Sequence, residues 1–185
     1  MIRWRLILII GVPILIGCNE VIPTNPDYIS DGFDYPVGKP NAKGYYDAQP
    51  FGKNNHLGSD LNGNGGGNTD LNDPVFAISN GFVKSAKKLK GGWGNVIRII
   101  HELPNGKQYE SIYAHLDKIL IKPNTFVKKG QIIGTIGTNN GQYLAHLHFE
   151  IRSFTNMGIG GGYSWFTMGY LNPTSFIKAH RKVKK

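Results

Sequence analysis

The chain has 185 residues, 40% of them hydrophobic, which predicts one domain with a packed core plus short accessory segments. Its single Cys excludes an intrachain disulfide, so stability must come from the core and from any bound metal. The formal net charge of +9 predicts attraction to anionic surfaces.

Residues 1–17 have the pattern of a secretory signal. Arg3 and Arg5 precede the apolar run from Leu6 to Ile16, which is too short to span a bilayer comfortably. The run ends at Gly17-Cys18, which resembles the cleavage site of a bacterial lipoprotein signal. This resemblance implies cleavage before Cys18 and a lipid on Cys18 that anchors the chain to a membrane, facing the periplasm or the cell surface. The alternative is a buried apolar Cys behind an uncleaved anchor.

An exported chain is not expected to meet nucleic acid, so its positive charge favours anionic wall polymer or lipid headgroups as partners. Residues 18–31 contain Pro23 and Pro26 and lack periodicity, which predicts a tether. The globular domain is expected at 32–179. A basic tail at 180–185 is either solvated or binds an anionic surface.

The domain is predicted to be all-β, with an antiparallel sheet, because short β-rich runs alternate with turn signals. Asn80-Gly81 predicts a hairpin joining the runs on either side of it. A weak helical turn is expected at 174–178, and a long Gly-rich and aromatic surface loop at 154–170. The predicted strands are 74–78, 81–85, 95–101, 108–115, 131–137 and 147–151.

Two predicted strands carry histidines on one face. In the last strand, alternation places His146, His148 and Glu150 together, opposite the intervening apolar residues. In the strand at 108–115, the same alternation places Tyr113 and His115 on a polar face, opposite a core face. A His-x-His pair or a lone His is a weak signal by itself, but the combination favours a shared cleft.

His56 and Asp60 precede a Gly- and Asn-rich run that argues against a helix, so we expect a loop. Either they are a surface His and a turn-capping Asp, or they converge on an ion. Hydrolytic zinc takes three protein ligands and leaves one position for water. His56, Asp60 and one of the later His pair would complete such a set, leaving the other His and His115 to act on protons or stabilise an oxyanion.

A calcium loop beginning at Asp60 is the competing interpretation, and it fails because Leu71 stands at its twelfth position, where a bidentate Glu is needed.

Three segments in this order, His56-x-x-x-Asp60, Tyr113-Ala-His-Leu116 and His146-Leu-His-Phe-Glu150, resemble the lysostaphin-like, or LytM-type, zinc endopeptidases. Further similarity lies at 73–77, 80–81, 92–95 and 127–134, so the resemblance spans about 32–176. It departs from the family at 139–145, where the stretch before His146 is bulkier than usual.

The resemblance implies an antiparallel sheet with a groove over one face. It implies one Zn²⁺ held by His56, Asp60 and His148, with His115 and His146 as catalytic residues. It implies hydrolysis of peptide cross-links in bacterial peptidoglycan; the alternative is a non-catalytic peptidoglycan-binding or amidase-activating lipoprotein, with a regulatory protein partner not identified by the sequence.

Other side chains have plainer expected roles. Glu150 either orients a ligand His or makes a salt bridge at the strand end. Trp93, Tyr163 and Trp165 either line the groove or pack within loops. The two remaining histidines, His101 and His180, match no motif and are expected to be non-functional.

Overall fold

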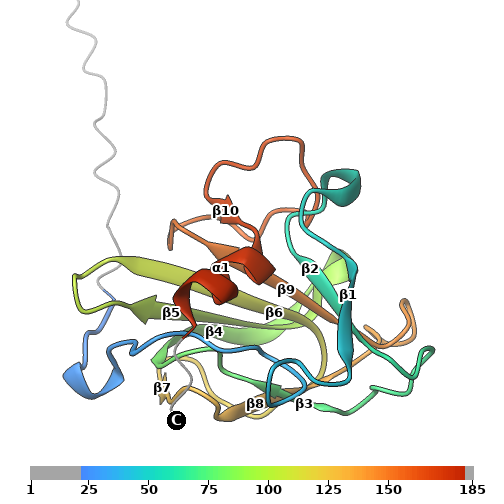
Figure 1. The fold of residues 1–185 in the computed structure, drawn as a ribbon, viewed down its shortest axis with the longest axis horizontal. Helices are drawn as coiled ribbons and strands as arrows, with labels where there is room; N and C mark the ends of the chain where they lie inside the picture. Colours follow the sequence, from blue (N-terminus) through green and yellow to red (C-terminus); the bar gives the residue numbers. More distant parts are fainter. Residues whose placement is uncertain (1–21, 182–185) are drawn as a thin grey trace, which may run out of the picture.

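The computed structural model describes residues 22–181, so the expected signal, Cys18 and the last four residues lie outside the described part. Within it, ten strands form one antiparallel sheet, which confirms the all-β prediction (Figure 1). No helix in this range has the length and apolar character needed to cross a membrane. The strands are β1 (Tyr45–Gln49), β2 (Ser59–Gly63), β3 (Pro74–Phe76), β4 (Gly81–Leu89), β5 (Gly94–Glu102), β6 (Gln108–Ile119), β7 (Phe126–Val127), β8 (Ile132–Ile136), β9 (Leu147–Arg152) and β10 (Tyr170–Leu171).

The main path of the sheet runs β1-β2-β9-β6-β5-β4-β7, while β10 pairs with β9, and β8 pairs with both β3 and β6. Within residues 22–181 the helical elements are short: three 3-10 turns, η1 (Pro26–Tyr28), η2 (Lys53–Asn55) and η3 (Gly91–Trp93), and one α-helix, α1 (Pro173–His180). The helical turn expected at 174–178 lies within α1, whose first turn is capped by the side chain of Asn172.

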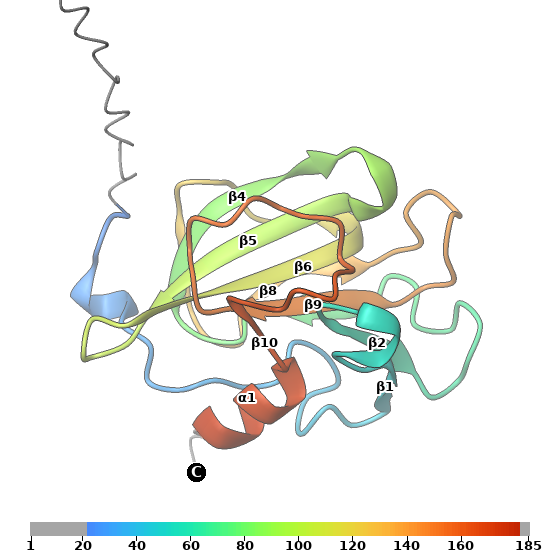
Figure 2. The same cartoon turned by 90° about the horizontal axis from the view of Figure 1, so that it is seen from above.

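The two faces of the central strands are buried differently. The main core lies on one face, where residues of β3, β8 and α1 pack against Phe149 and Tyr113. The opposite face of β5 and β6 carries a smaller apolar cluster around Trp93 and Val96. Figure 2 shows the loop between β9 and β10 passing over this second face. Every residue of β9 is buried, because apolar side chains face the core and polar ones lie under the loop.

The predicted hairpin at Asn80-Gly81 is wrong. The strand before it, β3, pairs with β8, whereas the strand after it, β4, pairs with β5 and β7. The Asn80 side chain instead makes tertiary bonds: its Nδ2 donates to the Ile29 carbonyl and its Oδ1 accepts from the Lys129 amide. Asn80 therefore joins distant segments rather than forming a two-residue turn.

The end of the expected tether packs against the domain. The Tyr28 ring lies 4.9 Å from that of Phe126, between centroids. The hydroxyls of Ser30 and Ser79 are 2.6 Å apart, and both residues are buried. Contacts with the sheet thus begin ahead of the boundary expected at residue 32.

Candidate functional site

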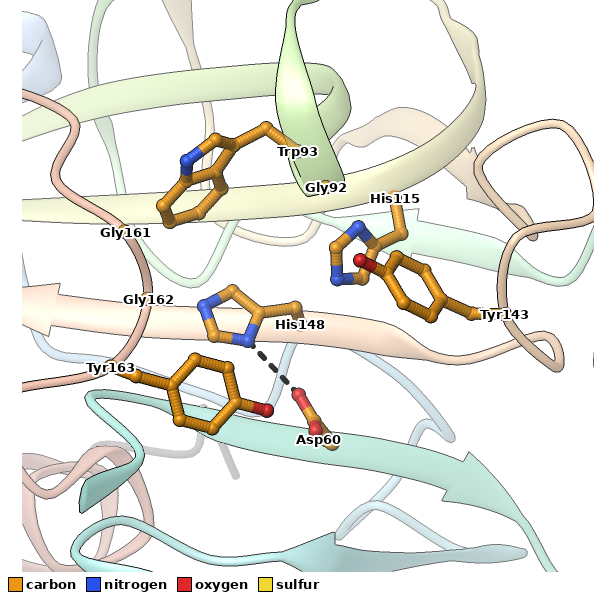
Figure 3. A pocket seen from close by; sticks show the side chains of 9 residues that line it. All are labelled: Asp60, Gly92, Trp93, His115, Tyr143, His148, Gly161, Gly162 and Tyr163. Carbon is orange, nitrogen blue, oxygen red and sulfur yellow. Dashed lines mark hydrogen bonds and ion pairs between the residues drawn. The ribbon is translucent and has the colours of Figure 1, made fainter. Parts of the chain in front are cut away.

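Strand pairing brings the residues of the first and last histidine motifs together. Asp60 lies in β2, directly opposite His148 of β9, and not in the loop expected from the sequence. Asp60 Oδ1 lies 2.9 Å from His148 Nδ1 (Figure 3). His56, four residues before Asp60, places its Nε2 3.0 Å from His148 Nδ1 and 3.3 Å from Asp60 Oδ1. Three ligand-type atoms therefore face one point.

This triangle fits a tetrahedral metal ion. Zinc with bonds of about 2.0–2.1 Å places neighbouring ligand atoms about 3.3 Å apart. The separations here, between 2.9 and 3.3 Å, need only small outward movements. Two imidazole nitrogens and one carboxylate oxygen also form a donor set of the kind found in zinc hydrolases.

The outer nitrogens of both rings have acceptors. His56 Nδ1 lies 2.8 Å from the Gln49 carbonyl oxygen, and His148 Nε2 lies 3.1 Å from Glu150 Oε1. Each ring can therefore donate an N–H outward and direct a lone pair at the shared point. Glu150 makes the contact expected of a residue that orients a ligand.

Two carboxylates, Asp60 and Glu150, place negative charge next to His148. Burial opposes its protonation, but the hydrogen bonds and charges of Asp60 and Glu150 outweigh burial and raise the pKa of His148 to about 9. For Asp60, burial favours the neutral acid, but the hydrogen bonds from His148 and His56 hold its pKa well below the usual range. The site is therefore built to attract positive charge.

A β-bulge brings His115 to the same pocket. Between the pairs Asn95–Leu116 and Ile97–Tyr113, two residues of β6 oppose one residue of β5. His115 has φ of 60°, a left-handed conformation that breaks the strand alternation. The expected polar face is therefore wrong: Tyr113 packs on Phe149 in the core, with ring centroids 5.3 Å apart.

Ala114 of β6 lies opposite His148 of β9. The site therefore lies on the face of β6 that the alternation in the sequence assigned to the core. The bulge turns His115 toward that face, where its ring centroid lies 5.6 Å from that of His148. Burial, together with the charges of His148 and His146, lowers the pKa of His115 to about 3, so its ring is neutral near pH 7.

His146 lies just before β9 and forms an isolated bridge with Gly137. Its Nδ1 is 2.8 Å from the Leu144 carbonyl oxygen, and its Nε2 is 3.9 Å from Asp60 Oδ1. The ring centroid lies 4.8 Å from that of His115. The two histidines thus stand side by side next to the ligand triangle.

An open pocket of about 110 Å³ lies over two corners of the triangle, Asp60 and His148. Figure 3 shows its aromatic walls, Trp93 from η3, Tyr143 from the loop before His146 and Tyr163 from the long loop. Trp165 is 84% exposed and is not part of the lining. The sequence did not single out Tyr143, although the bulky stretch at 139–145 was the available signal.

The two remaining histidines lie elsewhere. His101 is buried between the Asn80 carbonyl and the Ser111 hydroxyl, and His180 stacks on Phe176 at the end of α1. In both cases the ring makes contacts within the fold.

The model of the family described as peptidase family M23 matches residues 54–159, which include all three motifs. Lysostaphin from Staphylococcus simulans is 38% identical over 119 residues, covering 62% of this chain and 22% of lysostaphin. Lipoprotein NlpD from Yersinia enterocolitica is 43% identical over 79 residues, covering 43% of this chain and 76% of that protein.

Among solved structures, the catalytic domain of the antimicrobial peptidase lysostaphin from S. simulans superposes with a TM-score of 0.51 at 29% identity, over 82% of this chain and 93% of that domain. The chain thus spans most of a catalytic domain but less than a quarter of full-length lysostaphin. The motifs, the strand arrangement and a family match over more than half of the sequence agree, and the chain belongs to peptidase family M23.

Proposed function

We propose that this chain is a zinc-dependent endopeptidase that hydrolyses peptide cross-links of bacterial peptidoglycan. The observation that carries the proposal is the convergence of His56, Asp60 and His148 on one point beneath an open pocket, with ligand-type atoms 2.9 to 3.3 Å apart. A zinc ion held there would lower the pKa of a water molecule and polarise the scissile carbonyl.

The two neighbouring histidines take complementary roles in this proposal. With its Nδ1–H donated to the Leu144 carbonyl, His146 has a lone pair on Nε2 and can accept a proton from the attacking water. His115 is neutral because burial keeps its pKa low, so it retains one ring N–H. That N–H, which bonds the Trp93 backbone in the absence of substrate, can donate to the oxygen of the reacting carbonyl as negative charge develops.

We further propose export and anchoring to a membrane through a lipid on Cys18, with peptidoglycan and the membrane as partners. The Yersinia relative is named a lipoprotein, which supports this location. Two signals on the chain agree with it, the apolar run before Cys18 and the net charge of +9.

The second candidate is a non-catalytic module that activates another wall hydrolase. Its support is a relative from Escherichia coli, 40% identical over 78 residues, that is named murein hydrolase activator NlpD. That stretch covers 19% of the relative and 42% of this chain. The complete donor triangle and the pair of adjacent histidines favour the peptidase.

Incubation with purified sacculi separates the two candidates. The protein is tested with and without a chelator, beside His148→Ala, and released peptides are identified by mass spectrometry. Release by the untreated wild type alone supports the peptidase and identifies the bond that is cut. Binding without release, together with stimulation of a purified amidase, supports the activator instead.

A further inference from the structure

A layer of buried charge lies beside the ligand triangle, on the same face of the sheet. Arg152 and Glu150 are both fully buried in β9. Arg152 Nε and Nη2 lie 2.9 and 2.7 Å from Glu150 Oε2, while Glu150 Oε1 faces His148 Nε2. The two carboxylate oxygens of Glu150 thus serve different partners, one a guanidinium and one a ligand-type histidine.

The same guanidinium also holds the loop that forms one wall of the pocket. Arg152 Nη1 donates to the Gly158 carbonyl at 2.7 Å, and Nη2 donates to the Ile159 carbonyl at 2.6 Å. The chain continues from these carbonyls directly into residues 161–163, which line the pocket. Figure 3 shows the backbone of this segment beside His148.

A second arginine nearby offers a matched comparison. Arg98 of β5 makes a two-pronged pair with Glu110, at 2.8 and 2.7 Å, and donates to the loop carbonyl of Met157 at 2.7 Å. Its partner Glu110 lies opposite Arg152 across the strands, whereas Glu150 lies against His148. Both arginines therefore tie the loop to a buried carboxylate, but only Arg152 shares its carboxylate with a ligand-type histidine.

We propose that Arg152 is a positioning residue that couples the loop wall to the metal ligand His148 through Glu150. A carboxylate on the outer nitrogen of a ligand His fixes the ring orientation and increases its basicity. A lone Glu150 could rotate and would be a costly buried charge; two N–H groups of the guanidinium hold its Oε2 and compensate that charge. Through its remaining donors, Arg152 links the position of the loop to the orientation of His148.

This inference rests on the proposed zinc site, so the test measures metal binding itself. Full-length wild type, Arg152→Lys and Arg98→Lys are compared for zinc affinity by competition with a chelating dye and for the visible spectrum of bound Co²⁺. Lysine keeps the charge but lacks the fork. We expect Arg152→Lys to bind zinc about tenfold or more weakly, because loss of a residue that orients a metal ligand lowers metal affinity by this amount. The Co²⁺ spectrum should change as well, because the orientation of His148 changes.

Arg98→Lys is expected to loosen the loop, seen as faster limited proteolysis, while leaving zinc affinity and the Co²⁺ spectrum as in the wild type. Equal losses in both variants would make Arg152 a merely structural residue and overturn the coupling. Wild-type affinity and spectrum in Arg152→Lys would overturn it as well. Failure of the wild type to bind either metal would instead overturn the proposed function, and this inference with it.

A measurement on the wild type decides the matter if Arg152→Lys does not fold. The arginine Nε–H resonances are followed by NMR as Zn²⁺ is added. Coupling predicts that the Arg152 signal shifts with metal occupancy while the Arg98 signal stays in place. Two unmoved signals, or two that shift alike, contradict the proposal.

Discussion

Asp60 and His148 face each other across β2 and β9, as partners in an antiparallel pair, with Oδ1 2.9 Å from Nδ1. Directly paired side chains on one face of a sheet are held close by the backbone itself. The sheet therefore fixes two corners of the ligand triangle, and His56 supplies the third from the segment just before β2.

Asp60→Ala is expected to remove zinc, because the two remaining histidines form an incomplete set. Affinity should fall by more than about 100-fold, beyond the range of losses from outer-shell changes. Metal analysis after dialysis against a weak chelator measures the change. Asp117→Ala, which alters an exposed carboxylate, is the control and should retain zinc. Near-normal zinc in Asp60→Ala would contradict the ligand assignment.

His115→Ala and His146→Ala should separate metal binding from cleavage. Neither ring belongs to the ligand triangle, so both variants should bind zinc as the wild type does. Loss of a proton acceptor or of an oxyanion donor should lower the turnover number by about 100-fold or more. Peptide release from sacculi, measured beside zinc content, tests this. A variant that cleaves at the normal rate would have no catalytic role.

The sequence predicts the sheet because strand formation depends on local signals, and it predicts the grouping of the histidines because several motifs, each weak alone, occur together. The β-branched run in β5 and the alternation in β9 directly determine which side chains can pack on the core. The resemblance to the lysostaphin-like endopeptidases then implies that His56, Asp60 and His148 lie near one another, although no local rule specifies the pairing of β2 with β9.

The rest depends on tertiary contacts that no local pattern encodes. His115 reaches the pocket through a bulge at a non-Gly residue with positive φ, and its sequence surroundings carry no turn signal. Asn80-Gly81 has the sequence of a hairpin, but Asn80 is used to bind Ile29 and Lys129. In the sequence, Arg98 and Arg152 look like ordinary charged residues of a strand. Their bonds to the loop carbonyls appear only in the folded chain.

Because His101 is buried, we expect the free energy of unfolding to fall in acid. Burial lowers its pKa to about 4 in the folded state, against about 6.5 when unfolded. Between these values the unfolded chain binds the extra proton, so stability is present above about pH 6.5 and is lost as the pH falls towards 4. Going from about pH 7.5 to pH 5 should cost about 2 kcal/mol of unfolding free energy from this residue.

Urea unfolding of the chelator-treated protein at both pH values measures this cost. His101→Gln removes the titration, so its stability should depend less on pH by about the same 2 kcal/mol, whatever its absolute stability. An identical pH dependence in wild type and His101→Gln would rule out His101 as the source.

Gly92 and Tyr143 provide a test of the pocket wall. A Cβ on Gly92 would overlap the Tyr143 hydroxyl but would lie 3.6 Å from the adjoining ring carbon, an ordinary contact. Gly92→Ala should therefore displace Tyr143 within the pocket and raise KM about tenfold while zinc content stays unchanged.

Removing the hydroxyl makes room for the methyl group, so adding Tyr143→Phe should restore much of the lost affinity for substrate. Tyr143→Phe alone is the matched control in a double-mutant cycle. Additive losses in the double variant would mean that the two positions act independently and that the clash does not shape the wall.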